Sequence, residues 1–135
     1  MTTSAPAGLD AAQRSTLDGL VNRARALLTS DLEAQAAGRF GIHLDGTIED
    51  ETSLPDDISD KTTRSDLEQI VSHLRALGEG PSGAVARLVR EAVFTHLNRL
   101  VAIRVAEAIG LLPETLANGP RSRGFRDIGE IMPML

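Results

Sequence analysis

The sequence predicts a mainly α-helical protein, a small helical bundle of about three principal helices with an irregular acidic loop and a loose C-terminal tail. Three observations predict this fold class. Apolar residues recur at spacings of three and four, as on one face of a helix, and hardly ever alternate as in a strand. Aromatic residues make up only 2% of the chain, so aliphatic side chains must form the core. A length of 135 residues suits one hydrophobic core.

The first helix is expected over residues 11–37. Its apolar positions form one stripe at helical spacing, made of Leu17, Leu20, Val21, Ala24, Leu27, Leu28 and Leu32. Asp10 is suited to cap the N-terminus, and Gly38 to stop the helix. Residues 1–9 are small and polar, which predicts a disordered leader.

The middle of the chain is expected to be irregular before a second helix forms. Residues 39–46 alternate apolar and polar positions and can form at most one short extended segment. Residues 47–61 are acidic and rich in turn formers. They predict a solvated loop or an irregular crossing, and not a cation site, because the fixed ligand spacing of a calcium loop is missing. The second helix is expected to start at Thr63 or Ser65, with Ser65 and Glu68 as a capping box, and to end at Gly78.

The third helix is the strongest element and is expected over residues 84–109, after a tight connector in which Ser82 can act as a cap. Its apolar stripe is broad, which predicts contacts on more than one side. Gly110 is expected to stop it. We therefore expect one helical domain over residues 10–117 and an arginine- and glycine-rich tail over residues 118–135. The apolar end of that tail predicts that the sequence is the front part of a longer protein, truncated before a further domain.

The composition argues against several classes of function. The chain has no cysteine, which excludes disulfides and thiolate metal sites, and a cytoplasmic location is expected. We expect neither secretion nor membrane insertion, because residues 1–6 lack a basic region followed by an apolar stretch and no apolar run is long enough to span a membrane. There is no phosphate-binding glycine loop and no nucleophile elbow, and His43, His73 and His96 are scattered. We expect no catalytic, cofactor-binding or metal-binding residue in this chain.

Two groups of polar residues remain as candidates for contacts with DNA or with another domain. Asn98, Arg99 and Arg104 interrupt the most apolar helix, either as a polar network that fixes helix packing or as contacts to a phosphate or another domain's carboxylate. The second group, in the tail, consists of Arg121, Arg123 and Arg126. It is either a solvated basic turn or a contact to a nucleic-acid backbone.

Residues 91–104, followed by 107–113 and 123–127, resemble the N-terminal helical region of large adenine-specific DNA methyltransferases. These enzymes belong to bacterial anti-phage systems of the phage-growth-limitation, BREX and DISARM types. The residues that match the family pattern are Phe94, Asn98, Arg99, Ala102 and Arg104. His96 departs from the pattern, because an aromatic residue is more common there. The resemblance covers the last third of the chain closely and the first helix only in general character.

The resemblance implies a non-catalytic segment of an enzyme that transfers methyl from S-adenosylmethionine to the N6 amino group of adenine in DNA. This segment binds no cofactor itself, because neither the Asn-Pro-Pro-Tyr type of motif nor the cofactor's glycine-rich turn is present. Its expected partner is a downstream methyltransferase domain or a split partner chain. Contact with DNA is expected only through the full-length protein. The alternative is a freestanding helical adaptor for protein–protein interaction, with no enzymatic role. A small complete enzyme is the least supported hypothesis.

Overall fold

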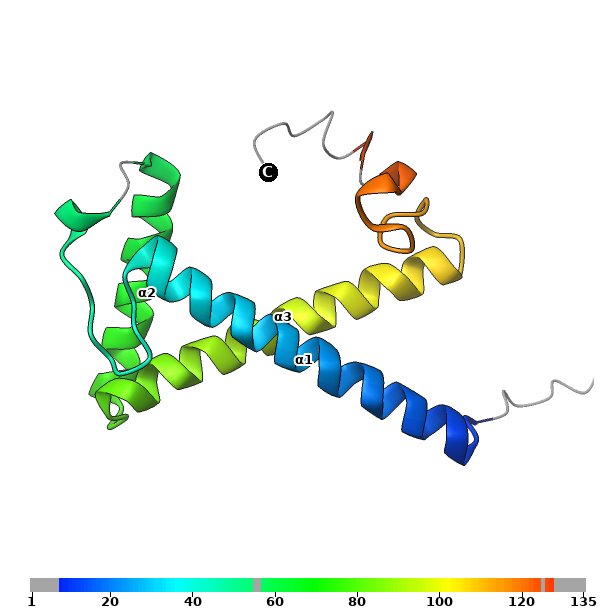
Figure 1. Cartoon of the computed structure of the whole chain (residues 1–135), viewed down its shortest axis with the longest axis horizontal. Helices are drawn as coiled ribbons and strands as arrows, with labels where there is room; N and C mark the ends of the chain where they lie inside the picture. Colours follow the sequence, from blue (N-terminus) through cyan, green and yellow to red (C-terminus); the bar gives the residue numbers. More distant parts are fainter. Residues whose placement is uncertain (1–7, 55–56, 125, 128–135) are drawn as a thin grey trace, which may run out of the picture. The chain divides into compact units, whose positions relative to one another are not determined.

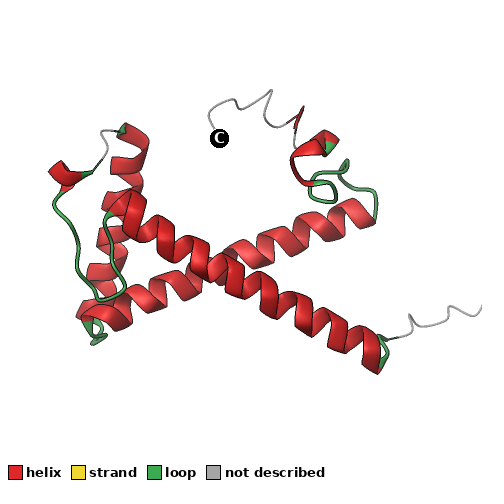
Figure 2. Ribbon diagram, viewed as in Figure 1, coloured by secondary structure: helices red, strands yellow, loops and turns green. Residues whose placement is uncertain are grey.

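The computed structural model describes residues 8–54, 57–124 and 126–127, and these are mainly helical (Figures 1 and 2). The elements in chain order are α1 (Ala11–Phe40), η1 (Glu51–Ser53), α2 (Ile58–Ala76), α3 (Pro81–Ala108) and η2 (Gly119–Arg121), where η denotes a 3-10 helix. An isolated antiparallel bridge joins Ile42 to Ile48, and no strand forms in the described ranges. The predicted fold class, mainly α with three principal helices, is confirmed.

The chain divides into two compact units, residues 1–90 and residues 91–135. The first contains α1, η1, α2 and the first ten residues of α3. The second contains the remainder of α3, η2 and the turns around it.

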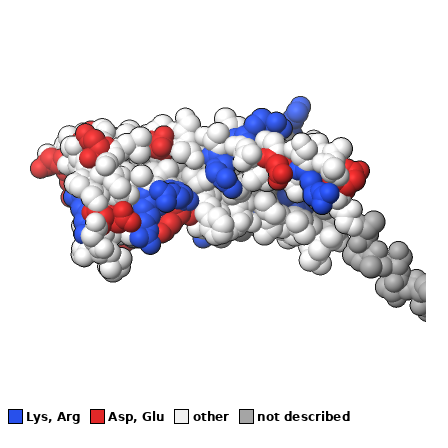
Figure 3. Space-filling view, turned by 90° about the horizontal axis from the view of Figure 1, so that it is seen from below, with Lys and Arg blue, Asp and Glu red and all other residues white. Residues whose placement is uncertain are grey.

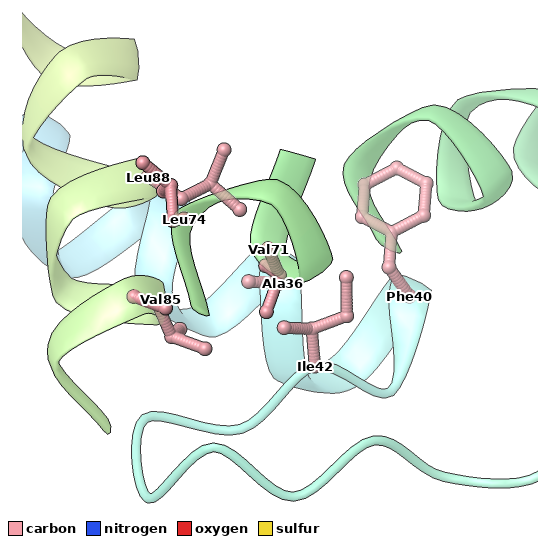
Figure 4. Packing of buried hydrophobic residues seen from close by; sticks show 8 residues of the cluster. Ala36, Phe40, Ile42, Val71, Leu74, Val85 and Leu88 are labelled. Carbon is pink, nitrogen blue, oxygen red and sulfur yellow. The ribbon is translucent and has the colours of Figure 1, made fainter. Parts of the chain in front are cut away.

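The hydrophobic core of the first unit forms where the end of α1, the C-terminal turns of α2 and the start of α3 meet (Figure 4). Its buried members are Ala36, Phe40, Ile42, Val71, Leu74, Ala84, Val85 and Leu88. Ile42, Val71 and Val85 are almost wholly inaccessible to solvent. The N-terminal two-thirds of α1 take no part in this core, and Leu17, Leu20 and Leu27 of the predicted stripe are exposed.

The loop after α1 is fixed by its backbone. Gly41 adopts the left-handed conformation (φ 63°), in which its N–H and that of Ile42 satisfy the last carbonyls of α1. Two arginines of α2 then hold the loop: Arg64 donates to the carbonyl of Glu49, and Arg75 Nη2 donates to the carbonyl of Gly46 at 2.5 Å. The acidic stretch therefore begins as an ordered loop fastened to α2.

Several predicted boundaries are wrong for local reasons. α1 continues to Phe40 because Gly41, rather than Gly38, takes the left-handed conformation. α2 begins at Ile58, and the Asp57 side chain accepts a hydrogen bond from the N–H of Asp60 (3.1 Å) in its first turn. The expected capping box of Ser65 and Glu68 therefore lies inside the helix. α3 starts with Pro81 in its first position, which proline favours, so Ser82 is not its cap.

The expectation that α3 is covered on more than one side along its length is wrong within the described residues. Burial extends from Ala84 to Val93, and the helix beyond that point exposes most of its apolar side chains. No described helix is both long and apolar enough to cross a membrane. Residues 1–7 of the expected leader and residues 128–135 of the expected tail lie outside the described residues.

Candidate functional site

The second half of α3 carries an unusual run of exposed apolar side chains. We call it the apolar face; its members are the exposed Phe94, Val101 and Val105, the partly buried Leu97, and Ile109 in the turn that follows α3. Their spacings of three and four place them within an arc of about 120° around the helix. Phe94 is 67% exposed, Val101 50%, Val105 52% and Ile109 65%. Large exposed apolar areas of this kind mark interaction surfaces in soluble proteins.

The three polar residues predicted on this helix do not form one site. Asn98 lies within the arc of the apolar face, between Val105 and Ile109 in helical register, whereas Arg99 is rotated from Asn98 by about 100° and Arg104 by about 120°. Asn98 and Arg99 are exposed, and their side chains make no hydrogen bond within the described residues. The described residues therefore do not join these side chains into an internal polar network.

Arg104 is instead part of a contact that the sequence analysis missed. Its Nη1 lies 3.1 Å from Oε2 of Glu107, whose side chain is only 3% exposed. The other oxygen of Glu107, Oε1, accepts hydrogen bonds from the backbone N–H groups of Thr115 and Leu116. We call this arrangement the Glu107 clasp. It ties the chain that follows α3 back onto the last turn of that helix.

The surroundings of Glu107 favour its ionised form. Burial opposes the ionised form, but the backbone N–H groups of Leu116, Thr115 and Ala117, together with the charge of Arg104, outweigh burial and lower the pKa of Glu107 below its usual value. A single carboxylate therefore accepts hydrogen bonds from backbone N–H groups of the turn that follows α3. Sequence alone gave no signal, because an i, i+3 arginine–glutamate pair is common on exposed helices.

Beyond the clasp, the chain forms a compact turn that carries three arginines. The side chain of Ser122 is completely buried and accepts a hydrogen bond from the N–H of Asn118 at 3.1 Å. The N–H of Gly124 donates to the carbonyl of Glu114 at 2.7 Å. Gly124 must be glycine here, because a Cβ would lie 2.4 Å from Oγ1 of Thr115. The turn is thus ordered by its own backbone and small side chains.

We call Arg121, Arg123 and Arg126 the basic turn. All three are exposed. Arg123 Nε lies 3.8 Å from Asp127 in an exposed pair, and no ion pair of Arg121 or Arg126 occurs among the described residues. Residues 91–135 contain five arginines and five acidic residues, so the net charge of −5 falls entirely on residues 1–90. On the face drawn in Figure 3, acidic and basic side chains are interspersed.

A small hollow in the first unit is the other place where charged groups gather. It is lined by Arg39, Glu51, Leu54, Asp60, Lys61 and Arg64. Its cations already have carboxylate partners: Arg39 Nη2 lies 2.5 Å from Asp60, and Arg64 Nε lies 2.6 Å from Glu68. We interpret it as part of the loop's anchorage. Among the described residues, no group of three or more histidines and acidic residues could hold a metal ion.

Comparisons with known proteins give no family for this chain. No family model matches it, and neither a curated protein nor a solved structure does. The features of the structure that could serve a function are the apolar face, the Glu107 clasp and the basic turn.

Proposed function

We propose that this chain is the non-catalytic N-terminal helical segment of an adenine-N6-specific DNA methyltransferase of a bacterial anti-phage system. In this proposal the catalytic domain, which binds S-adenosylmethionine, belongs to a following segment or a partner chain. The apolar face of α3 packs against that domain. The chain supplies a docking and positioning surface and performs no methyl transfer.

The exposed apolar face is the observation that carries the proposal. Phe94 begins both this face and the residue pattern that resembles the methyltransferase family, and Asn98 of that pattern lies on the same side of the helix. Covering the half-exposed side chains Phe94, Val101, Val105 and Ile109 removes apolar area from water. At roughly 1 kcal/mol each, this contributes about 4 kcal/mol to association. That amount is enough to select one docking surface once the domain is held nearby.

The simplest test is the nucleotide sequence after the codon for Leu135. The proposal expects a cofactor-binding βαβ region with a glycine-rich turn and an Asn-Pro-Pro-Tyr type of motif, in the same or an adjacent reading frame. A stop codon followed by unrelated genes would contradict it. The alternative, a freestanding adaptor, is distinguished by the absence of any methyltransferase motif nearby.

The docking surface itself is tested by co-purification of this chain with the catalytic region. Val101→Asp places a carboxylate in the centre of the apolar face, and burying that charge without a partner is costly, so we expect affinity to fall at least 100-fold. His96→Asp is the matched control. It introduces the same charge at an exposed position on the same helix, about 140° away from Val101. Equal losses for the two variants would exclude the apolar face as the docking surface.

Adenine methylation of genomic DNA provides the second readout. Cells that express the catalytic region with the wild-type chain should carry N6-methyladenine, and the Val101→Asp variant should reduce it. Light scattering of the chain alone separates the adaptor alternative, which expects a stable homodimer. A monomer that associates only with the methyltransferase domain supports the main proposal.

A further inference from the structure

We infer that α1 mediates self-association, by packing antiparallel against α1 of a second copy of this chain. The contact uses exposed leucines that we call the α1 edge; its members are Leu17, Leu20 and Leu27. Leu17 and Leu20 are about half exposed, and Leu27 is 73% exposed. Ala36 and Phe40, which enter the core, lie about 100–140° around the helix from Leu17. The α1 edge is therefore on a different side of the helix from the core.

The length and spacing of α1 suit a pair of helices. Residues 11–35 precede the part of α1 that joins the core, and they span about seven turns, or about 38 Å. That is about three and a half heptads, the length over which two helices can pack along a seam. Leu17, Leu20, Ala24 and Leu27 follow the spacing of three, four and three residues that such a seam requires.

An antiparallel pair about a two-fold axis uses the whole of this length. The midpoint of residues 11–35 is residue 23, and Leu20 and Leu27 lie on either side of that point at nearly equal distances. In a two-fold contact, a residue of one copy meets a second residue of the partner, and the reverse contact also forms. Leu20 of each copy therefore comes opposite the partner's Leu27.

The charged residues beside the α1 edge are self-complementary in this arrangement. Arg14 comes opposite the partner's Asp31, and Asp18 comes opposite the partner's Arg25. Within the described residues, Arg14, Asp18 and Arg25 are exposed and form no ion pair. Asp31 accepts a hydrogen bond from Gln35 at 2.8 Å, and a carboxylate has capacity for further donors. A parallel dimer would place each charge beside its own copy, so the charges favour an antiparallel second copy.

The first test is sedimentation equilibrium of the full chain, which should show a dimer that dissociates on dilution. Leu27→Asp places an unpaired carboxylate in the contact twice per dimer, so dimerisation should weaken at least about 100-fold. Ala26→Asp is the matched control, because Ala26 is exposed and lies about 130° around the helix from the centre of the α1 edge. It should leave the dimer intact. Circular dichroism checks that both variants keep their helices.

The second test is of the register. Arg14→Asp and Asp31→Arg should each weaken the dimer about fivefold to tenfold, because each homodimer then brings like charges together twice. Mixing the two single variants should restore the affinity, since every contact again joins opposite charges. A parallel dimer, by contrast, would tolerate either single variant. Unchanged affinity in both variants would therefore overturn the antiparallel arrangement.

The inference depends on neither the methyltransferase resemblance nor the apolar face of α3, so the two proposals can fail separately. Light scattering should find the Leu27→Asp chain monomeric, and the adaptor alternative is judged on that variant. A homodimer that persists in Leu27→Asp and is lost in Val101→Asp would overturn the inference. A wild-type chain that stays monomeric at about 0.5 mM would overturn it as well.

Discussion

One pair of substitutions tests whether the two halves of α3 have different environments. Val85 is completely buried in the core of the first unit, whereas Val101 is 50% exposed on the apolar face. Val85→Ala and Val101→Ala make the same chemical change within the same helix. Their gain in helix propensity, about 0.5 kcal/mol, is therefore the same and cancels from the comparison.

The magnitudes follow from burial. Removing two methyl groups from the buried Val85 loses about 1.6 kcal/mol of transfer free energy, and the cavity adds up to about 1.2 kcal/mol. After the propensity gain, Val85→Ala should lower the free energy of unfolding by about 1–2.5 kcal/mol. For Val101, half of the transfer term, about 0.8 kcal/mol, nearly cancels the propensity gain. Its effect should stay within about 0.5 kcal/mol.

Urea denaturation followed by circular dichroism at 222 nm measures both effects, with the denaturant slope compared to the wild type. If the two units unfold in separate steps, the Val85→Ala shift should appear in the step that exposes the first unit. A loss above about 1.5 kcal/mol for Val101→Ala would refute the reasoning, because it would mean that the isolated chain already buries the apolar face.

Three other predictions concern the contacts that order the loops. The folded structure lowers the pKa of Glu107, so the ionised side chain stabilises the fold above the unfolded-state pKa, near 4.5, and this stabilisation is lost as the pH falls through the folded-state pKa. Amide exchange of the N–H groups of Thr115 and Leu116 should therefore accelerate in that acidic range. Glu107→Gln should remove this pH dependence. Arg64→Met should destabilise the chain by about 2 kcal/mol, since the carbonyl of Glu49 loses a buried donor, as measured by urea denaturation; an unchanged midpoint would refute the anchoring role. Gly41→Ala should cost about 1–2 kcal/mol because φ is 63° and a Cβ would lie 2.9 Å from Cβ of Glu49; thermal unfolding checks it, and Gly38→Ala, inside α1, should be neutral or stabilising.

The candidate site was predicted only in part. The sequence identified the arginines of the basic turn and the residues Asn98, Arg99 and Arg104, and the structure places all six on the surface of residues 91–135. Helical register then separates Asn98 from Arg99 and Arg104, which adjacency in the sequence suggested to be one cluster. The Glu107 clasp could not be predicted, because it depends on the path of the chain after Gly110.

The helices themselves followed from local sequence. Asp10 caps α1 with the expected side-chain hydrogen bond, and the three apolar stripes predicted three helices, although α2 begins at Ile58, well before the predicted start at Thr63 or Ser65. The end of α1 was predicted at Gly38, whereas Gly41 is the glycine that takes the left-handed conformation and ends the helix.

Sequence by itself determined that the chain is helical and where its apolar side chains lie around each helix, because periodicity and capping act over a few residues. Tertiary structure alone decided which of those side chains are covered. The broad stripe of α3 looked uniform in sequence, yet Val85 is buried and Val101 is half exposed. Burial depends on which other segments pack against each turn of the helix. At the start of α3 these include the loop after α1, which contacts from Arg64 and Arg75 hold in place.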